Sequence, residues 1–440
     1  MLLLALPSIA QAQFTFTTNN GTITITGYTG PGGDVTIPDS TNGYPVTAIG
    51  NDAFLNCTTI TSISIPYSVT NIASRPFGSC TSLTAISVDA SNLFYTSAGG
   101  VLFDSSQSLL IAYPGGRAGA YTIPDSVTSI EGDAFYCCFT LSGISIPTGV
   151  TNIGANAFYY DSALTSVTIP SSVVSIGSGA FALCQALSAI TVDPENPVYS
   201  STNGVLFDVS QTTVIQYPAG ITSWSYTIPQ GVTNVGYDAF FGCVKLASVT
   251  IPNTVTTIGG SAFGMCLGLT NIWLPNSVTS IGNQAFYGCT GLHNVIIPSS
   301  VASIGFDGFA LCQSLIGAYF EGNAPANPDG TAFFLDSNMK VYYLPGTTGW
   351  SSTFGSRPTA LWFLPKPIIL SNPNFGVQTN AFGFVVSWAT NLSLVVEACT
   401  NLANSTWSPV STNVLTNGCF CFSDPNWTNN ASCLYRIRSP

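Results

Sequence analysis

The stretch IPNTVTTIGGSAFGMCLGLTNIWLPNSVTSIGNQAFYGCTGLHNVII, which runs from Ile251 to Ile297, carries one phrase twice over. Pro252, Pro275 and Pro298 stand 23 residues apart, and the apolar residues between them recur at the same offsets. A fixed period of this size is typical of a solenoid, in which each repeat packs only against its neighbours. The sequence therefore predicts a stack of coils, each one repeat long.

The phrase continues in both directions and can be followed through nine units across residues 38–320. Counted from the proline of each unit, and with a five-residue insertion in the first unit allowed for, Val stands at offset 3, Phe at offset 11 and Leu or Ile at offset 17. Offsets 17 to 22 read LxxIxI, which predicts a short strand that buries its apolar residues and pairs in parallel with the next coil. We expect the aromatic residues at offset 11 to form a buried ladder that supplies a large share of the core. They are Phe54, Phe77, Phe135, Phe158, Phe181, Phe240, Phe263, Phe286 and Phe309.

The opposite edge of each unit is predicted to be a single helical turn. Offset 9 often carries a short polar residue just before Ala-Phe-x-x-Cys, as at Asp133, Asn156 and Asp238. Asp and Asn in that place are typical of the N-cap of a helix. The expected fold is therefore a β-rich solenoid with one short parallel strand and one helical turn in each 23-residue coil.

Eight of the thirteen cysteines occupy offset 14. On stacked coils these side chains would stand about one strand spacing apart, ~4.8 Å, whereas a disulfide needs converging Cβ atoms at ~3.8 Å. We therefore predict a ladder of buried thiols, in which Asp161 replaces the cysteine of the fourth unit. The eight are Cys57, Cys80, Cys138, Cys184, Cys243, Cys266, Cys289 and Cys312.

The amino-terminal segments have a different character from the repeats. Residues 1–12 are apolar and end in Ala10-Gln11-Ala12, as the end of a secretory signal does, although a short buried strand is the alternative interpretation. Residues 13–37 alternate apolar and polar around Asn19-Asn20-Gly21, which predicts a β cap over the first coil. We accordingly expect an exported protein, secreted or held at the cell surface.

Two inserts and a carboxy-terminal region complete the chain. The inserts, at about residues 94–123 and 198–228, each carry Gly-Val-Leu-Phe-Asp and a second apolar run, so both are expected to be hairpins that leave the coil. Residues 321–365 lose the period but stay aromatic, which predicts a second cap. Residues 368–440 alternate in strand-like runs and predict a small all-β sandwich module. Its four cysteines predict one or two disulfides of unknown pairing. They are Cys399, Cys419, Cys421 and Cys433.

The repeat phrase IPxSVTxIGxxAFxxCxxLxxIxI resembles the BspA-type leucine-rich repeats of bacterial surface and secreted proteins. The YSSxNGVLFD pattern of the inserts and the NGYPVTAIG opening at Asn42–Gly50 strengthen this resemblance, which covers roughly residues 14 to 365. It implies a leucine-rich-repeat solenoid that takes part in adhesion and protein binding through extended surfaces and without an active site.

The composition limits the possible partners. Only 6% of the residues are charged, against about 25% in an ordinary soluble domain. Eight Lys and Arg residues in a chain of formal charge -11 argue against nucleic acid or an anionic membrane as the partner. After residue 12 no segment approaches the ~18 uninterrupted apolar residues of a membrane-spanning helix. We expect neither membrane insertion nor a cofactor, and the oligomeric state stays open.

Enzymatic interpretations have little support in these residues. His293 is the only histidine, at an offset where other units carry Thr, Ser or Ala, so we expect it to face solvent rather than act in catalysis. A β-solenoid enzyme that cleaves glycans would need two carboxylates a few Å apart. Glu131 and Glu195 instead lie in different units, without an acidic partner at the same coil position. We therefore predict a protein that is not an enzyme and keep the glycan-cleaving solenoid as a distant alternative.

The outward positions of the predicted strands change along the stack. Offset 21 carries Ser or Thr in the first six units and then Trp273, Ile296 and Tyr319. Large aromatic residues beside Asn on a rigid sheet are suitable anchors for a protein or a glycan. The predicted ligand-binding residues are Asn271, Trp273, His293, Asn294, Ile296 and Tyr319.

Two interpretations of this stripe remain open from the sequence. The stripe binds an extracellular protein or glycan, or it is covered by the cap around Trp350 or by the carboxy-terminal module. In the second case the solenoid is a passive spacer that displays the last module. Exposure of Trp273 distinguishes the two.

Overall fold

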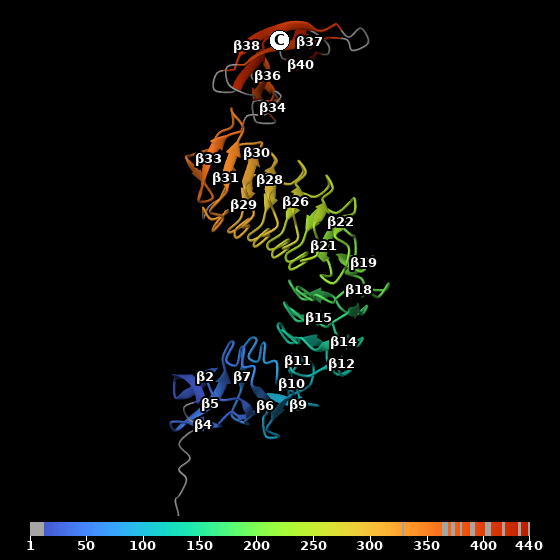
Figure 1. Cartoon of the computed structure of the whole chain (residues 1–440). Coiled ribbons are helices and arrows are strands. Elements are labelled where there is room, and N and C mark those ends of the chain that lie inside the picture. The colour runs from blue at the N-terminus through green and yellow to red at the C-terminus, as the bar shows by residue number, and fades with distance from the viewer. Residues whose placement is uncertain are drawn as a thin grey trace, which may run out of the picture. The chain divides into compact units, whose positions relative to one another are not determined.

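The computed structural model describes residues 13–327, 330–362, 368–370, 375–378, 381–387, 392–400, 406–415, 419–429 and 433–438 (Figure 1). The chain divides into two compact units, which we describe separately. The first comprises Met1–Ser223 and Val235–Lys245, and the second comprises Trp224–Asn234 and Leu246–Pro440. The signal predicted at residues 1–12 and the boundary predicted at Pro365 lie outside the described residues.

A hairpin opens the first unit. Strands β1 (Phe14–Asn19) and β2 (Thr22–Tyr28) pair antiparallel, and Asn20 and Gly21 between them both have positive φ. Strand β2 then pairs in parallel with β5 (Tyr44–Ile49), which pairs antiparallel with β4 (Ser40–Thr41) and in parallel with β7 (Asn71–Ile72). The hairpin therefore begins a parallel ladder that the later coils continue.

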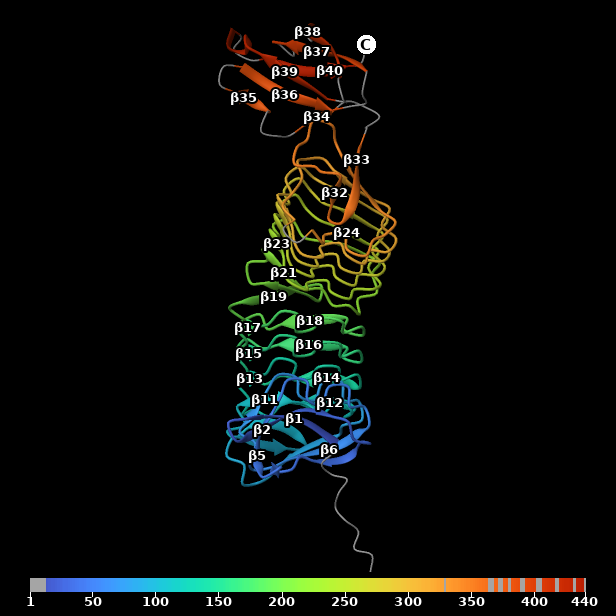
Figure 2. The same ribbon diagram turned by 90° about the vertical axis from the view of Figure 1, so that its left-hand side faces the viewer.

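Each coil of the first unit contributes two short strands rather than the single strand that we expected. Figure 2 shows β11, β13, β15 and β17 as one column and β12, β14, β16 and β18 as another. Partners in a ladder stand one repeat apart, as with Asn152 and Ser175. The first column comprises β11 (Leu109–Ala112), β13 (Ser129–Ile130), β15 (Asn152–Ile153) and β17 (Ser175–Ile176). The strands of the other side are β3 (Gly33–Thr36), β6 (Ile60–Ile65), β8 (Ala85–Val88), β12 (Gly119–Thr122), β14 (Leu141–Ser145), β16 (Ser166–Ile169) and β18 (Ala189–Val192).

The predicted helical turn is wrong, because the Ala-Phe-x-x-Cys segment forms consecutive turns with left-handed residues. Asp133 has φ 59° and Cys137 has φ 60°. Alternate backbone N–H groups bond to the next coil, as when Phe135 N donates to Ala157 O at 2.8 Å, and those between them bond three residues back, as when Tyr136 N donates to Asp133 O at 3.0 Å. Asp and Asn tolerate the left-handed region better than most residues. The polar residue before Ala-Phe therefore marks a left-handed position and not an N-cap.

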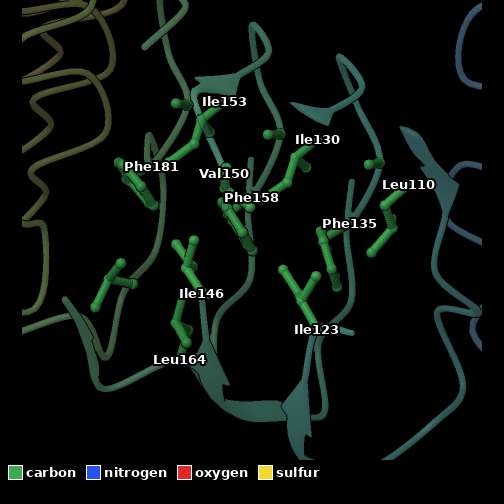
Figure 3. Packing of buried hydrophobic residues seen from close by; sticks show 14 of the residues in the cluster. Leu110, Ile123, Ile130, Phe135, Ile146, Val150, Ile153, Phe158, Leu164 and Phe181 are labelled. Carbon is green, nitrogen blue, oxygen red and sulfur yellow. The ribbon is translucent and has the colours of Figure 1, made fainter. Parts of the chain in front are cut away.

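The predicted phenylalanine ladder is confirmed. The ring centroids of Phe135 and Phe158 lie 4.7 Å apart, and those of Phe158 and Phe181 lie 5.3 Å apart (Figure 3). Aliphatic residues such as Ile130 and Ile153 pack beside the rings in the same close-up (Figure 3). Burial of each Phe side chain contributes ~1.5–3 kcal/mol, so the ladder is a major source of stability.

The predicted ladder of buried thiols is confirmed for seven of its eight members, whereas Cys57 at its start is only half-buried. The Cys184 thiol donates to Phe158 O at 3.0 Å and the Cys289 thiol donates to Phe263 O at 3.1 Å, in each case in the preceding coil. Both thiols are free. Asp161 takes the same place in its coil, where it is fully buried and accepts a hydrogen bond from Cys138 N at 2.8 Å. Burial raises the pKa of the Asp161 carboxyl well above its ordinary value.

The two inserts form the hairpins that we expected, but each hairpin returns to the stack instead of leaving the coil. Strand β10 pairs antiparallel with β9 and with β11, but β11 also pairs in parallel with β13. Tyr113 then stacks on Phe135 at 5.0 Å, and Tyr217 of the second insert stacks on Phe240 at 5.1 Å. A tyrosine therefore replaces the ladder phenylalanine in each inserted coil. The remaining strands of the inserts are β9 (Tyr95–Ala98), β10 (Val101–Asp104), β19 (Tyr199–Thr202), β20 (Val205–Asp208) and β21 (Thr213–Gln216).

The second unit repeats the same coil, and its longer ladder extends past Phe320 (Figure 1). Phe333 stacks on Phe309 at 5.5 Å and Asp336 occupies the ladder position of a cysteine, so the coil pattern continues into the segment predicted as a cap. The long ladder comprises β22 (Ser225–Thr227), β24 (Ser248–Thr250), β26 (Asn271–Trp273), β28 (Asn294–Ile297), β30 (Gly317–Phe320), β31 (Lys340–Tyr343) and β33 (Arg357–Leu361), with β32 (Thr353–Phe354) beside β33. The shorter strands are β23 (Asn234–Val235), β25 (Thr257–Ile258), β27 (Ser280–Ile281) and β29 (Ser303–Ile304).

The described strands after residue 367 form two antiparallel sheets. Phe384 and Phe422 from one sheet and Leu394 and Val396 from the other share a buried cluster. Cys421 and Cys433 carry free thiols, so neither forms the predicted disulfide. One sheet comprises β34 (Ile368–Leu370), β35 (Gly376–Gln378), β36 (Ala381–Ser387) and β39 (Cys419–Asp424). The other comprises β37 (Ser393–Cys399), β38 (Ser408–Val414) and β40 (Leu434–Arg438), and the 3-10 turn η2 (Trp427–Asn429) precedes β40.

Candidate recognition face

The long ladder of the second unit brings most of the predicted site residues into two columns. Trp273 pairs with Ile296, Ile296 with Tyr319 and Tyr319 with Tyr342, and we call these four residues the outer column. Inward residues alternate with them, as Ile272 and Val295 do. The register of the ladder therefore places the predicted anchors on one face of one sheet.

Trp273 is the most exposed member of the outer column. Its side chain is 67% exposed, so neither the cap nor the carboxy-terminal module covers it in this structure. An indole held on a rigid strand and left in water is unusual, because Trp is mostly buried in folded proteins. This exposure is the property that a binding anchor requires.

Tyr319 is half-buried because other aromatic rings flank it. Its ring stacks on Tyr342 at 5.0 Å with an interplanar angle of 8°, and Trp362 approaches at 5.0 Å and 57°. A Cβ atom on Gly317 would lie 2.8 Å from the Tyr319 ring, so glycine lets the ring lie across the strand. Burial, and then the neighbouring Tyr342, raise the pKa of the Tyr319 phenol. The carboxy-terminal end of the outer column is therefore a fixed aromatic stack.

A polar column runs beside the outer column. Asn271 pairs with Asn294, Asn294 with Gly317, and Gly317 with Lys340. The two asparagines and Lys340 are exposed. Their amide and ammonium groups can donate or accept hydrogen bonds next to the apolar rings, which is the combination that orients a bound ligand.

His293 belongs to a third position, immediately before the strand. It is exposed, as predicted from its offset, and its carbonyl accepts from Ile316 N at 2.8 Å. Trp224 occupies the position of His293 in an earlier coil. The backbone bonds show this, because Thr270 N donates to Ala247 O at 3.1 Å and Ala247 N donates to Trp224 O at 2.7 Å, one coil further back each time. Trp224 is 68% exposed. This third column thus adds a second exposed indole to the same sheet.

Sequence reasoning missed Trp224, Ile316, Tyr342 and Trp362. Trp224 lies in the segment assigned to the second insert, and Tyr342 and Trp362 lie where the period is lost. Counting back 23 residues from Ala247 gives Trp224, so the repeat spacing would have been enough to find that residue. Ile316 holds the same offset as His293 and could have been found in the same way.

The chemistry available on this face is that of binding. Among the described residues of the outer and polar columns, the ionisable groups are the Tyr319 and Tyr342 phenols and the Lys340 ammonium, and a pair of carboxylates is missing. Within the described part of the chain, no three His, Cys, Asp or Glu side chains gather closely enough to hold a metal ion. No helix in the described ranges has the length and apolar character needed to cross a bilayer.

Comparison with known proteins places the repeats in a family. The family model for the BspA type leucine rich repeat region matches in six copies over residues 34–111, 118–227 and 219–333, which is more than half of the chain. This chain belongs to the BspA-type leucine-rich repeat family. The 23-residue coil, the Phe ladder and the Cys ladder are the features of this chain that lie within the matched regions.

Two solved structures resemble this BspA-type protein over most of its length. A leucine rich cell surface protein from Faecalibacterium prausnitzii is 29% identical, with 71% of this chain and 94% of that chain covered and a TM-score of 0.47. The pneumococcal vaccine antigen PcpA is 22% identical, with 75% and 85% covered and a TM-score of 0.49. Among curated proteins no relative is found.

Proposed function

We propose that this BspA-type protein is an exported, non-catalytic recognition protein that binds an extracellular protein or glycan on the outer column. The observation that carries the proposal is the 67% exposure of Trp273 on a regular parallel sheet. Exposed aromatic anchors on a rigid surface contribute most of the binding energy at many interfaces. Membership of a family of bacterial surface proteins supports export.

The face has the composition of a binding surface. Exposed apolar groups at Trp224, Trp273 and Ile316 are bordered by the amides of Asn271 and Asn294. Patches of this kind on a soluble protein mark contact sites. Because the strands and the coil interior hold the columns in place, little conformational entropy is lost on binding.

The test is a binding array of extracellular-matrix proteins and bacterial and host glycans, probed with the purified chain. A hit should weaken at least tenfold in Trp273→Ala and remain unchanged in Thr168→Ala, which alters an outward residue of the first unit. An array without hits, or hits that survive Trp273→Ala, would favour the alternative of a passive spacer that displays the carboxy-terminal module.

A further inference from the structure

The two inserts interrupt a column of left-handed turn residues in the first unit. Each regular coil places one such residue before its ladder phenylalanine, with φ between 50° and 64°. The inserted coils continue the ladder with Tyr113 and Tyr217 instead. We call the two resulting gaps the first and second junctions. The residues of the column are Asp52, Arg75, Asp133, Asn156, Gly179 and Asp238.

An arginine of the chain itself fills the first junction. Arg75 Nε donates to Asp52 Oδ1 at 2.7 Å and its Nη2 donates to Asp52 Oδ2 at 3.0 Å. Its guanidinium lies over the Tyr136 ring, 4.9 Å from the centroid. The cavity left between Arg75, Asp133 and Tyr136 measures about 10 Å³, and another of about 240 Å³, also lined by Arg75, extends toward Tyr95 and Glu131.

The second junction has Gly179 in the position of Arg75. A single cavity of about 160 Å³ extends there from Ile176 and Ile215 to Phe181 and Gln216. A Cβ atom on Gly179 would lie 2.6 Å from Asn156 Oδ1 and 3.0 Å from Asp238 Oδ2. Two side-chain oxygens therefore lie close to the position that the Cβ atom of an arginine at residue 179 would take.

The polar atoms at this point are acceptors. The Asn156 amide forms a hydrogen bond with Asp133, so its Nδ2 group donates away from the junction and its oxygen is left on the Gly179 side. Burial raises the pKa of the Asp238 carboxyl to about 7. Acceptors that converge in this way repel one another unless a donor or a cation lies between them.

Gln216 adds a buried polar group to the wall of the cavity. It is 3% exposed and stands where the first junction has the apolar Ala112. Its Nε2 donates weakly to Tyr217 O at 3.3 Å and to Ala239 O at 3.4 Å, so its oxygen is the acceptor that remains. The second junction thus differs from the first by losing a cation and gaining an acceptor.

We propose that the second junction is a binding site for the guanidinium group of an arginine side chain presented by a partner protein. The first junction shows the mode of binding, since Arg75 occupies the same place there between an acid and an aromatic ring. Phe241 follows its ladder phenylalanine as Tyr136 does, and its ring lies 6.2 Å from that of Tyr159. A planar fork of donors can bond to several acceptors at once, whereas an ammonium is a compact point charge.

The experiment uses the full chain with ethylguanidinium as the probe and calorimetry or NMR titration as the readout. The wild type should bind one probe. Asp238→Asn should weaken binding by about tenfold or more, because a hydrogen-bonded charge is lost. Gln216→Ala, which copies the first junction, should weaken it several-fold. Binding should strengthen from pH 6 to pH 8 as Asp238 loses its proton, and this dependence should disappear in Asp238→Asn.

Two exchanged variants provide the matched control. Gly179→Arg should abolish probe binding by filling the site from within, and Arg75 at φ 50° shows that this turn accepts arginine. Arg75→Gly should open the first junction and raise the stoichiometry from one to two. Methylammonium or Ca²⁺ binding as tightly as the probe, or unchanged binding in both Asp238→Asn and Gly179→Arg, would overturn the proposal. Thermal unfolding of each variant shows whether it is folded.

Discussion

The outward faces of the two units differ although their inward faces are nearly the same. Strands β16 and β18 bury Val167 and Ile190 and expose Thr168 and Thr191, whose hydroxyls hydrogen bond to one another at 3.0 Å. Strands β26 and β28 bury equivalent residues but present Trp273 and Ile296. The inward residues fix the coil, so the outward ones can change without refolding it. The recognition that we propose and the stability of the coil therefore depend on separate sets of positions in this chain.

The largest expected effect tests whether the two interiors are equivalent. Phe181→Ala in the first unit and Phe286→Ala in the second should each lower the free energy of unfolding by ~3–5 kcal/mol, because each removes a buried ring from a stack. Chemical denaturation measures the loss, and hydrogen exchange shows whether neighbouring coils open first. Unchanged unfolding in either variant would contradict the stacked core.

The next largest effect is on ligand binding, and it tests the difference between the outward faces of the two units. Trp273→Ala should cost at least ~2 kcal/mol of binding energy, or about thirtyfold in Kd, once a ligand is in hand. Its thermal unfolding should shift little, since the side chain is mostly in water and surface changes stay within about 0.5 kcal/mol. Equal loss of binding and stability would mean that the indole is part of the fold.

A smaller effect on stability is expected from the two buried aspartates that replace a ladder cysteine. Asp161 and Asp336 replace the ladder cysteine, one in each unit. Burial raises the pKa of Asp336 to about 7, so the folded protein holds this proton more tightly than the unfolded chain does. Stability is therefore greatest below the ordinary carboxyl pKa and falls as the pH rises toward 7.

Asp336→Cys should remove this dependence and raise stability at pH 7.5 by about 1–2 kcal/mol. Asp161→Cys should likewise reduce the fall in the free energy of unfolding as the pH rises. Urea unfolding at pH 5 and pH 7.5 measures both, and an unaltered slope in the double variant would show that other groups control the pH dependence.

The smallest effect is expected on the outward side of the first unit, which carries Ser and Thr. Thr168→Ala removes the hydroxyl contact with Thr191 but leaves the coil interior intact, so stability should change by less than about 0.5–1 kcal/mol. Ligand binding should not change at all. A binding defect in Thr168→Ala would extend the recognition surface into the first unit.

The sequence was sufficient to predict what is periodic. A residue that recurs every 23 positions meets its own copies in the stack, so Phe158 and Cys184 could be placed from spacing alone. The turn was misjudged because Asp and Asn favour both N-caps and left-handed positions. The partners of the backbone N–H groups, alternate ones of which lie in the next coil, decide between the two.

The missed parts of the site lie where the period breaks. Tyr113 and Tyr217 replace a phenylalanine, so the inserted coils escape a search for the repeat phrase. Phe333 follows Phe309 by 24 residues instead of 23, which hid the coil that carries Tyr342. The acceptors around Gly179 come from separate coils, and their convergence depends on an insert whose path the sequence does not specify.

The buried thiols of the ladder allow the local opening of each coil to be measured. Alkylating reagents attack the thiolate, and burial raises the pKa of Cys80 to about 12 and that of Cys184 well above its ordinary value. A thiol that also donates to a carbonyl in the preceding coil can react only after the two coils part. The labelling rate of each cysteine therefore records how often its own coil opens, and mass spectrometry of the labelled peptides would read that frequency along the stack without any introduced probe.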